Sequence, residues 1–188
     1  MKGVMSFPRI RWSASLLLLG SAVLIASQLR SEEASLLHAE RSFTVHLDAA
    51  PGQVFPLFGP IGECEWAPRW DPKMIFPADG FCPEKGSVLT TSDEDGEEIW
   101  VVTGYDAQNA FISYVAVLPG RVVTEIEVRV QKQGENKSIA EVTHRRTALS
   151  AAGNHFVSAL SENAARHAAH WEHAINEALR KRRENAGH

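Results

Sequence analysis

Three histidines near the C-terminal end of the chain have the residue type and spacing that could hold a metal ion. His167, His170 and His173 follow one another at intervals of three, and side chains three or four apart are neighbours on a helix. Each step of three residues, however, turns the side chain by about 60° around a helix of 3.6 residues per turn. Only His167 then falls on the apolar face of that helix, and no partner cluster of zinc ligands occurs elsewhere. We therefore expect no metal and no other cofactor.

His167 has a second chemical role open to it, inside a cavity. Beside Trp171, it could donate a hydrogen bond or a proton to a bound molecule. His144 and Arg146 lie two residues apart on one face of a predicted strand, so they could point into the same space. The alternatives are that His144 and Arg146 lie on the solvent face and that His167 is an ordinary boundary residue.

A segment rich in tryptophan is the other concentration of side chains that could act on a ligand. Trp66 and Trp70 could form the lip of a pocket, with Glu63 or Glu65 available as a base. Alternatively, the two rings simply fill one end of the core. Asp71 precedes a proline and is interpreted as a turn residue.

Trp100 and Tyr114 lie in predicted strands, where they could belong either to the cavity wall or to the outer face of a sheet. The predicted ligand-binding residues are Trp66, Trp70, Trp100, Tyr114, His144, Arg146, His167 and Trp171. The candidate catalytic residues are His167, His144 and Glu65.

Sequence motifs exclude several common classes of enzyme. The chain contains no GxSxG, P-loop, GxGxxG, HExxH or EF-hand spacing, which argues against the usual hydrolases, nucleotide-binding proteins and metalloproteases. Cys64 and Cys82 are the only cysteines. They could form a disulfide in an oxidising compartment or remain two buried free thiols.

The longest predicted element is an amphipathic helix over residues 151–181. With Leu160 as the reference, a rotation of about 100° per residue gathers the apolar side chains on one broad face. That face consists of Phe156, Leu160, Ala164, His167, Ala168, Trp171, Ile175, Ala178 and Leu179. A helix of this length needs a partner surface of comparable length.

The strands that precede the helix provide that surface. Period-two alternation predicts strands at residues 42–47, 122–131 and 138–149, and turn residues delimit further strands at 87–91, 98–105 and 111–118. A short helical region follows the first strand. Residues 73–86 are interpreted as irregular. The short turns between the strands indicate one curved antiparallel sheet covered by the helix, an α+β fold in a single domain.

The N-terminus resembles a secretory signal. Lys2, Arg9 and Arg11 precede an apolar run at residues 14–26, an order typical of signal peptides. The run is short for a bilayer-spanning helix, but an uncleaved membrane anchor is the alternative. Removal of residues 1–27 would move the formal net charge from −4 to −7 because it deletes those three cations and no acidic residue. Such an acidic protein is a poor candidate for binding nucleic acid.

The order of elements and several local patterns resemble the START-like helix-grip (SRPBCC) superfamily. This superfamily includes polyketide cyclases, lipid-transfer domains and birch-pollen-allergen-like proteins. The patterns are FTVHLDAAP at residues 43–51, VFPLF at 54–58, ECEWAPRWDP at 63–72, TALS at 147–150 and HW at 170–171. The tryptophan-bearing segment is similar to that of one bacterial subgroup. The resemblance implies a cavity between sheet and helix that holds an apolar or amphipathic molecule, without implying one chemistry.

The predicted organisation is a signal or anchor at residues 1–27, a linker at 28–40, a helix-grip domain at 41–183 and a tail at 184–188. The leading hypothesis is an exported, monomeric carrier or binding protein for a lipid or other hydrophobic small molecule, in the periplasm or anchored to the membrane facing it. One alternative is a cyclase- or dehydratase-like enzyme that uses His167 with Glu65 or His144 as acid and base. Another is an envelope protein that binds a partner and no ligand.

Overall fold

The computed structural model describes residues 35–78 and 84–186. The chain divides into two units, Met1–Ser35 and Leu36–His188, and every helix and strand named below lies in the second. The predicted signal or anchor and Cys82 fall outside the described residues. Cys64 is exposed, with its thiol sulfur 3.8 Å from the carbonyl oxygen of Pro60.

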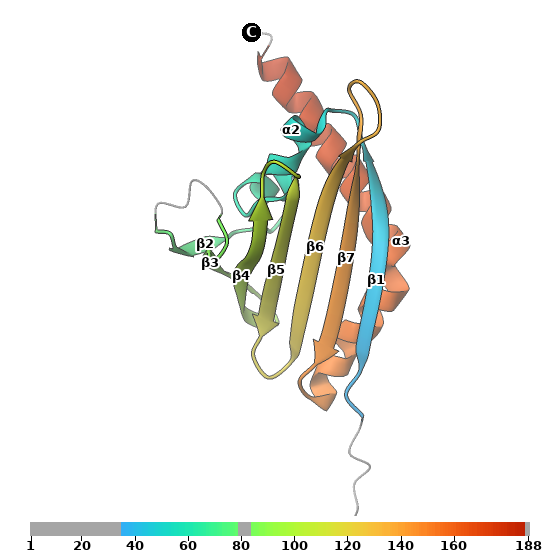
Figure 1. Ribbon diagram of the computed structural model, residues 1–188. Helices are drawn as coiled ribbons and strands as arrows, with labels where there is room; N and C mark the ends of the chain where they lie inside the picture. The colour runs from blue at the N-terminus through green and yellow to red at the C-terminus, as the bar shows by residue number, and fades with distance from the viewer. Residues whose placement is uncertain (1–34, 79–83, 187–188) are drawn as a thin grey trace, which may run out of the picture. The chain divides into compact units, whose positions relative to one another are not determined.

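Seven antiparallel strands form one curved sheet (Figure 1). They are β1 (His38–Leu47), β2 (Lys73–Phe76), β3 (Val88–Asp93), β4 (Gly96–Asp106), β5 (Phe111–Leu118), β6 (Val122–Lys132) and β7 (Ser138–Ala148). Their order across the sheet is β1-β7-β6-β5-β4-β3-β2. The first strand therefore pairs with the last, and each of the others pairs with its neighbour in the chain. The predicted α+β architecture, with a curved sheet and a long C-terminal helix, is confirmed.

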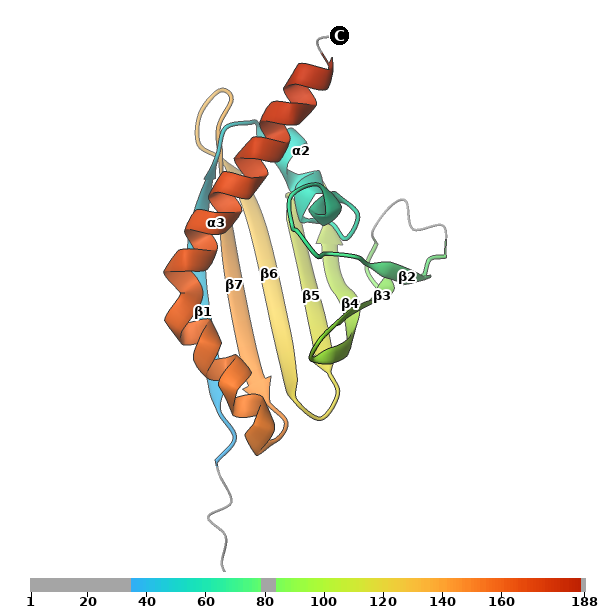
Figure 2. The same ribbon diagram turned by 180° about the vertical axis from the view of Figure 1, so that it is seen from behind.

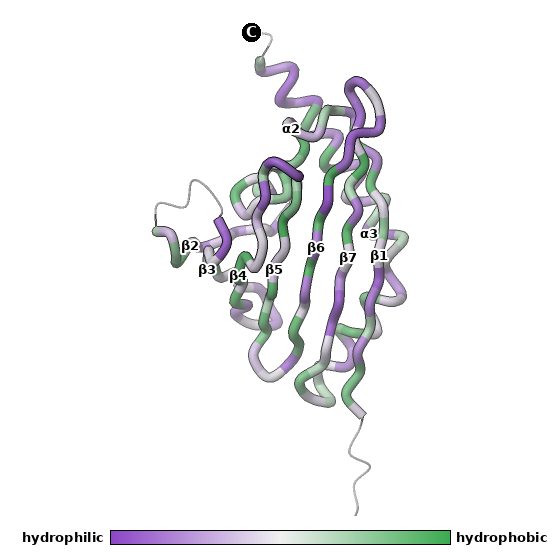
Figure 3. The backbone as a smooth tube through the Cα atoms, viewed as in Figure 1, coloured by the Kyte–Doolittle hydropathy of each residue, from purple (hydrophilic) through white to green (hydrophobic). Residues whose placement is uncertain are grey.

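The inner face of the sheet follows from alternation along the strands, which Figure 3 shows clearly on β6. Along β6, every second residue from Val122 to Val130 is buried, while Glu125 and Arg129 are exposed. The register places Tyr114 of β5 opposite Ile126, and Ile126 opposite His144 of β7. Side chains from three adjacent strands thus meet on one face.

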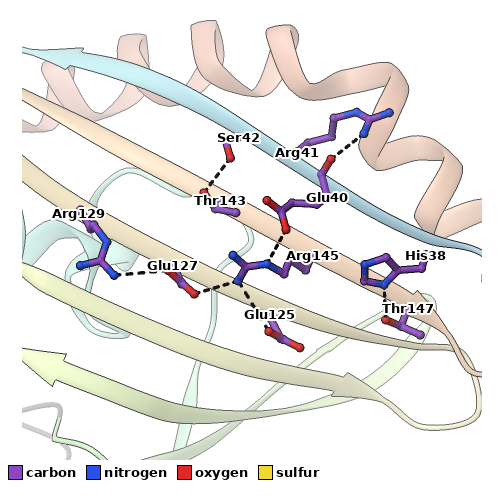
Figure 4. Close-up of polar contacts among 10 residues, drawn as sticks. All are labelled: His38, Glu40, Arg41, Ser42, Glu125, Glu127, Arg129, Thr143, Arg145 and Thr147. Carbon is purple, nitrogen blue, oxygen red and sulfur yellow. Dashed lines mark hydrogen bonds and ion pairs between the residues drawn. The ribbon is translucent and has the colours of Figure 1, made fainter.

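The outer face of the sheet is polar, and its ion pairs fix which side chains of β7 point outward. Arg145 lies at its centre, with Nε 2.7 Å from Oε2 of Glu40 and Nη1 2.9 Å from Oε1 of Glu127 (Figure 4). Exposed ion pairs of this kind contribute little stability. Because neighbouring residues of a strand point to opposite faces, Arg145 outside requires His144 and Arg146 inside.

Three short helical segments follow β1: α2 (Pro51–Val54), η2 (Phe55–Phe58) and η3 (Gly62–Glu65). Pro51 is at the first helical position of α2, where its missing N–H costs nothing. Val54, Phe55, Leu57 and Phe58 are all buried and anchor these segments to the core.

The long helix α3 (Asn154–Ala186) follows a single 3-10 turn, η4 (Ala151–Gly153). It lies along β1 and β7 rather than over the middle of the sheet (Figure 2). Its fully buried side chains are Val157 and Leu160 near one end and Ile175, Ala178 and Leu179 near the other. Between Leu160 and Ile175, none of the described side chains of α3 is fully buried. The helix is therefore docked at both ends, and its middle borders a more open space.

The end of β1 is fastened to α3 by side chains of the helix. Oδ1 of Asn176 accepts a hydrogen bond from the amide of Asp48 at 2.9 Å, and its Nδ2 donates one to the carbonyl of His46 at 3.0 Å. Oε2 of Glu172 accepts one from the amide of His46 at 2.9 Å. These bonds satisfy backbone groups that the sheet edge would otherwise leave unpaired.

Three boundaries differ from the sequence-based prediction. β1 begins at His38, inside the segment interpreted as a linker, because its first residues pair with the outer end of β7. α3 continues to Ala186, past the predicted end of the domain. Residues 73–76 form the edge strand β2, which the prediction of an irregular segment missed. Three consecutive apolar residues in this strand, Met74, Ile75 and Phe76, leave no alternation that would reveal it.

Candidate functional site

A cavity of about 350 Å³ lies between the segment that follows η2, strands β4 to β7 and the middle of α3. Its volume is within the range of small-molecule sites. It is lined by Glu63, Trp66, Ala67, Pro68, Arg69, Trp70, Glu98, Trp100, Tyr114, Thr124, Ile126, Val128, His144, Arg146, His170 and Trp171. Seven of the eight predicted ligand-binding residues are in this set, and His167 is not.

The two tryptophans of the loop are fixed by hydrogen bonds to backbone carbonyls. The indole N–H of Trp66 donates to Leu57 at 2.7 Å, and that of Trp70 donates to Pro60 at 2.6 Å. With its polar atom satisfied in this way, Trp66 is almost completely buried. Both indole rings are thus held in place along one side of the cavity.

Edge-to-face ring contacts connect the loop to the rest of the wall. The ring centroids of Trp66 and Trp171 are 5.0 Å apart, and those of Trp70 and Trp100 are 5.1 Å apart. Trp100 in turn lies 6.1 Å from Tyr114. These are favourable geometries for aromatic pairs. The loop, the sheet and α3 therefore each contribute flat aromatic surfaces to the cavity wall.

Tyr114 has a structural hydrogen bond in this wall. Its hydroxyl donates to the carbonyl oxygen of Phe58 at 2.7 Å. Burial, together with the nearby carboxyl of Glu63, raises the pKa of Tyr114 well above its usual value. Tyr114 is thus neutral at any physiological pH and holds η2 against β5.

His144 is a buried titratable group in the cavity wall, with 5% of its surface exposed. Its ring centroid lies 5.8 Å from that of Phe43 and 5.9 Å from that of Trp171. Burial, assisted by the charges of Arg146 and His167, lowers the pKa of His144 to about 3. The imidazole is therefore neutral, with one nitrogen able to donate and the other able to accept.

Arg146 is the next inward residue on β7. Its Nη1 donates to the carbonyl oxygen of Phe156 at 3.0 Å. Burial lowers its pKa, and the charge of Glu98 partly offsets this. A guanidinium remains charged under these conditions, so Arg146 is a fixed cation at one end of the cavity.

Two carboxyl groups face the same space. Burial raises the pKa of Glu63 to about 8, so this side chain is mostly protonated at neutral pH. Burial also raises the pKa of Glu98, although the charge of Arg146 acts in the opposite direction. Raised carboxyl pKa values in a concave site are a common feature of functional sites.

The candidate Glu65 requires a correction, since it points away from the cavity. Its Oε2 accepts a hydrogen bond from Nε of Arg182 on α3 at 2.7 Å. That bond, which outweighs desolvation, lowers the pKa of Glu65. Successive residues of a 3-10 helix are about 120° apart. Glu63 and Glu65 are two positions apart in η3, so their side chains point to different sides of it. Glu63 is the inward carboxyl instead.

The candidate His167 also requires a correction, because His170 lines the cavity in its place. The predicted face was centred on Leu160, but α3 lies along the edge of the sheet and presents Trp171 and the adjacent His170 to the opening. His167 is half-buried, and burial with the charge of Arg146 lowers its pKa. Among the described residues, no group of three or more His, Cys, Asp or Glu side chains is placed to hold a metal ion.

Sequence reasoning missed Glu98 as a lining residue, although a signal was present. Glu98, Trp100 and Val102 occupy every second position along β4, and all three lie toward the interior. A carboxyl at the inward position of a predicted strand could have been identified from that period alone.

No protein-family model matches the sequence, and no curated protein matches it by sequence. Solved structures do match. Norcoclaurine synthase from Thalictrum flavum superimposes with a TM-score of 0.56 at 12% identity, over 78% of this chain and 96% of that one. The protein XoxI from Bacillus cereus gives 0.54 at 17% identity, over 80% and 99%. An uncharacterised protein from Rhizobium leguminosarum gives 0.55 at 16% identity, over 78% and 97%.

The fold is the helix grip. At such low identities the matches establish the architecture alone, which agrees with the resemblance to the START-like superfamily seen in the sequence. Another structure of the norcoclaurine synthase contains dopamine and hydroxybenzaldehyde. That observation belongs to the plant enzyme. Membership of a particular bacterial subgroup stays a prediction.

Proposed function

We propose that this protein binds an apolar or amphipathic small molecule in the cavity between its sheet and α3. The observation that carries the proposal is a space of about 350 Å³ whose wall combines the rings of Trp66, Trp70, Trp100, Tyr114 and Trp171 with polar and charged groups at defined positions. Such a lining is characteristic of ligand pockets. A dry cavity of about 150 Å³ already accepts benzene, so this one has room for a molecule with two rings.

A fluorescent apolar probe tests the proposal directly. We expect N-phenyl-1-naphthylamine to bind the wild-type protein saturably, with one probe per chain. Ile126 lies in the cavity wall, so Ile126→Trp should fill the space and abolish binding. Val123→Trp is the matched control, because Val123 lies on the outer face of the same strand.

Two results would contradict the proposal. Wild-type protein that shows no saturable binding would overturn it. So would a folded Ile126→Trp variant, with an unchanged circular dichroism spectrum, that binds the probe as tightly as Val123→Trp does.

A carrier role in the cell envelope is part of the same proposal. It rests on the signal-like order of charge and hydrophobicity at residues 1–27. In the described part of the chain, no helix is long and apolar enough to cross a bilayer. Fractionation of cells that express the full chain, combined with N-terminal sequencing, would distinguish a cleaved exported form, an anchored form and a form that is not exported.

A second candidate function is acid–base catalysis on the bound molecule, of the cyclase or dehydratase type. The observation in its favour is a protonated carboxyl, Glu63, in the same cavity as the neutral imidazole of His144. Glu63 replaces Glu65 in this hypothesis, and His144 replaces His167. Turnover of a bound candidate substrate that disappears in Glu63→Gln, with its binding intact, would favour the enzyme over the carrier.

A further inference from the structure

The polar end of the cavity is formed by two consecutive inward residues of β7. His144 is opposite Ile126, and Arg146 is opposite Thr124, in the register with β6. Both side chains line the cavity. They lie on a rigid strand in the interior of the sheet, so their positions do not depend on a loop.

Both side chains have unused hydrogen-bonding capacity. Three buried atoms have no hydrogen-bond partner in the described part of the chain: both ring nitrogens of His144 and Nε of Arg146. Leaving a buried polar atom unpaired costs about 1–3 kcal/mol. Native proteins rarely accept that cost without a reason. Three such atoms on adjacent side chains therefore indicate that something with complementary atoms occupies this end.

The two groups are held in place by other contacts. Phe43 and Trp171 pack edge-on against the ring of His144, and the carbonyl oxygen of Phe156 accepts a hydrogen bond from Nη1 of Arg146. Both side chains are thus fixed in position before any ligand arrives. Binding then needs little ordering of the protein, which favours affinity.

The unpaired atoms define the chemistry of the complementary group. Nε of Arg146 is a donor only, and the neutral imidazole supplies one further N–H. Glu98 lines the same cavity and acts electrostatically on Arg146, so the guanidinium charge is partly balanced. An oxygen acceptor therefore suits the site, whether it carries a full negative charge or belongs to a neutral carbonyl.

We propose that His144 and Arg146 form a subsite that binds a carbonyl or carboxylate oxygen of an otherwise apolar, ring-bearing ligand. This inference rests on the proposed function, since it specifies the ligand of the same cavity. The aromatic walls formed by Trp66, Trp100 and Trp171 hold the rings, and the subsite sets their direction.

Three probes that share one ring system test the subsite: 2-ethylnaphthalene without oxygen, 2-acetylnaphthalene with a neutral carbonyl, and 2-naphthoate with a carboxylate. We expect wild-type protein to bind at least one of the two oxygen-bearing probes about tenfold or more tightly than 2-ethylnaphthalene. The preferred probe tells the carbonyl from the carboxylate. His144→Phe and Arg146→Met should each bring the ratio between the affinities for the preferred probe and for 2-ethylnaphthalene close to one.

Arg145→Met is the matched control, because Arg145 lies on the outer face next to Arg146. It should keep the full preference. Equal binding of all three probes to wild-type protein would overturn the subsite while the proposed function stands. Retention of the preference in both inner variants would do the same. Failure of all three probes, including 2-ethylnaphthalene, would instead overturn the proposed function and the subsite together.

Wild-type protein provides a measurement that does not depend on how the variants fold. In ¹⁵N-labelled protein, the preferred probe should shift the Nε–H resonance of Arg146 and a ring-nitrogen resonance of His144, while 2-ethylnaphthalene shifts neither by a comparable amount. Unmoved resonances at saturating probe would contradict the inference.

Discussion

Burial shifts the pKa values of two cavity-lining residues, Glu63 and His144, in opposite directions. The folded state keeps the Glu63 carboxyl protonated up to about pH 8, and it keeps the His144 imidazole neutral down to about pH 3. Both shifts favour the uncharged form, as expected where charges lose their hydration. The cavity is thus nearly free of charge at these two residues across the neutral range.

Glu63 should make the free energy of unfolding depend on pH. The unfolded chain releases this proton near the ordinary value of 4.5, whereas the folded chain retains it to about 8. Between these values the folded state binds more protons, so stability falls as pH rises and levels off above pH 8. The slope is at most about 1.4 kcal/mol per pH unit. Glu63→Gln should flatten the curve, as measured by chemical denaturation from pH 6.5 to 8.

Two features of this experiment isolate Glu63. The contribution of His144 changes between about pH 3 and 6.5, where acidification protonates the unfolded chain first, so it lies mainly below the chosen window. Glu135→Gln is the control, since Glu135 is an exposed carboxylate in the loop between β6 and β7. Equal slopes for wild type and Glu63→Gln would show that Glu63 is not protonated in the folded state.

At the scale of elements, α3 fastens the loop that carries Glu63, Trp66 and Trp70. Arg182 makes a two-pronged ion pair with Glu65, and its Nη1 reaches the carbonyl oxygen of Gln53 at 3.4 Å. The pair is partly exposed, so its effect on global stability is small. Its position between the helix and η3 gives it a local effect on the lip of the cavity.

Arg182→Gln should therefore open the loop locally without unfolding the protein. The amides of Trp66 and Ala67 donate to the carbonyl of Glu63 at 3.1 and 2.8 Å, and we expect their hydrogen exchange to become faster in this variant. The expected change in global stability is below about 1 kcal/mol. Exchange measured by NMR reports both effects residue by residue.

Arg180→Gln is the matched control for Arg182→Gln. Arg180 pairs with Glu177 and Glu184 within its own helix, so its loss should leave the loop amides unchanged. Identical exchange at Trp66 and Ala67 in the two variants would mean that the Arg182 pair does not restrain the loop.

Across the whole domain, α3 is attached at its two ends and spans the cavity between them. One end depends on Gly153, where a Cβ atom would lie 1.8 Å from the carbonyl oxygen of Arg121, in the turn between β5 and β6. The other end depends on Ile175, Ala178 and Leu179 and on the bonds from Asn176 to the end of β1. This arrangement leaves the middle of the helix available to the cavity.

Gly153→Ala should loosen the first attachment. The added methyl group would force the turn and the helix apart, which typically costs about 1–3 kcal/mol. Gly52→Ala in α2 is the control, because no atom lies within 4 Å of its Cβ position and alanine favours a helix. Thermal unfolding should show a lower midpoint for Gly153→Ala and no loss for Gly52→Ala. A midpoint at the wild-type value in Gly153→Ala would contradict this account of how the helix is docked.

Local periodicity was enough to predict the architecture. The alternation from Val122 to Gln131 identifies a half-buried strand, and the broad apolar face ending in Ile175, Ala178 and Leu179 identifies a long amphipathic helix. These patterns report on one element at a time, and short turns leave few ways to combine them. That periodicity left open whether Trp100 and Tyr114 lie on the inner or the outer face, and the sheet's packing against the loop and α3 places both in the cavity wall.

Contacts between elements decided the polar details. Both faces of β7 are mixed, so only pairing with Glu40 and Glu127 on the outside places His144 and Arg146 within. The rotation of α3 against the sheet edge selects His170 over His167, and the turn of η3 selects Glu63 over Glu65. A strand or helix period shows which residues share a face, but the direction of that face depends on the partners that pack against it.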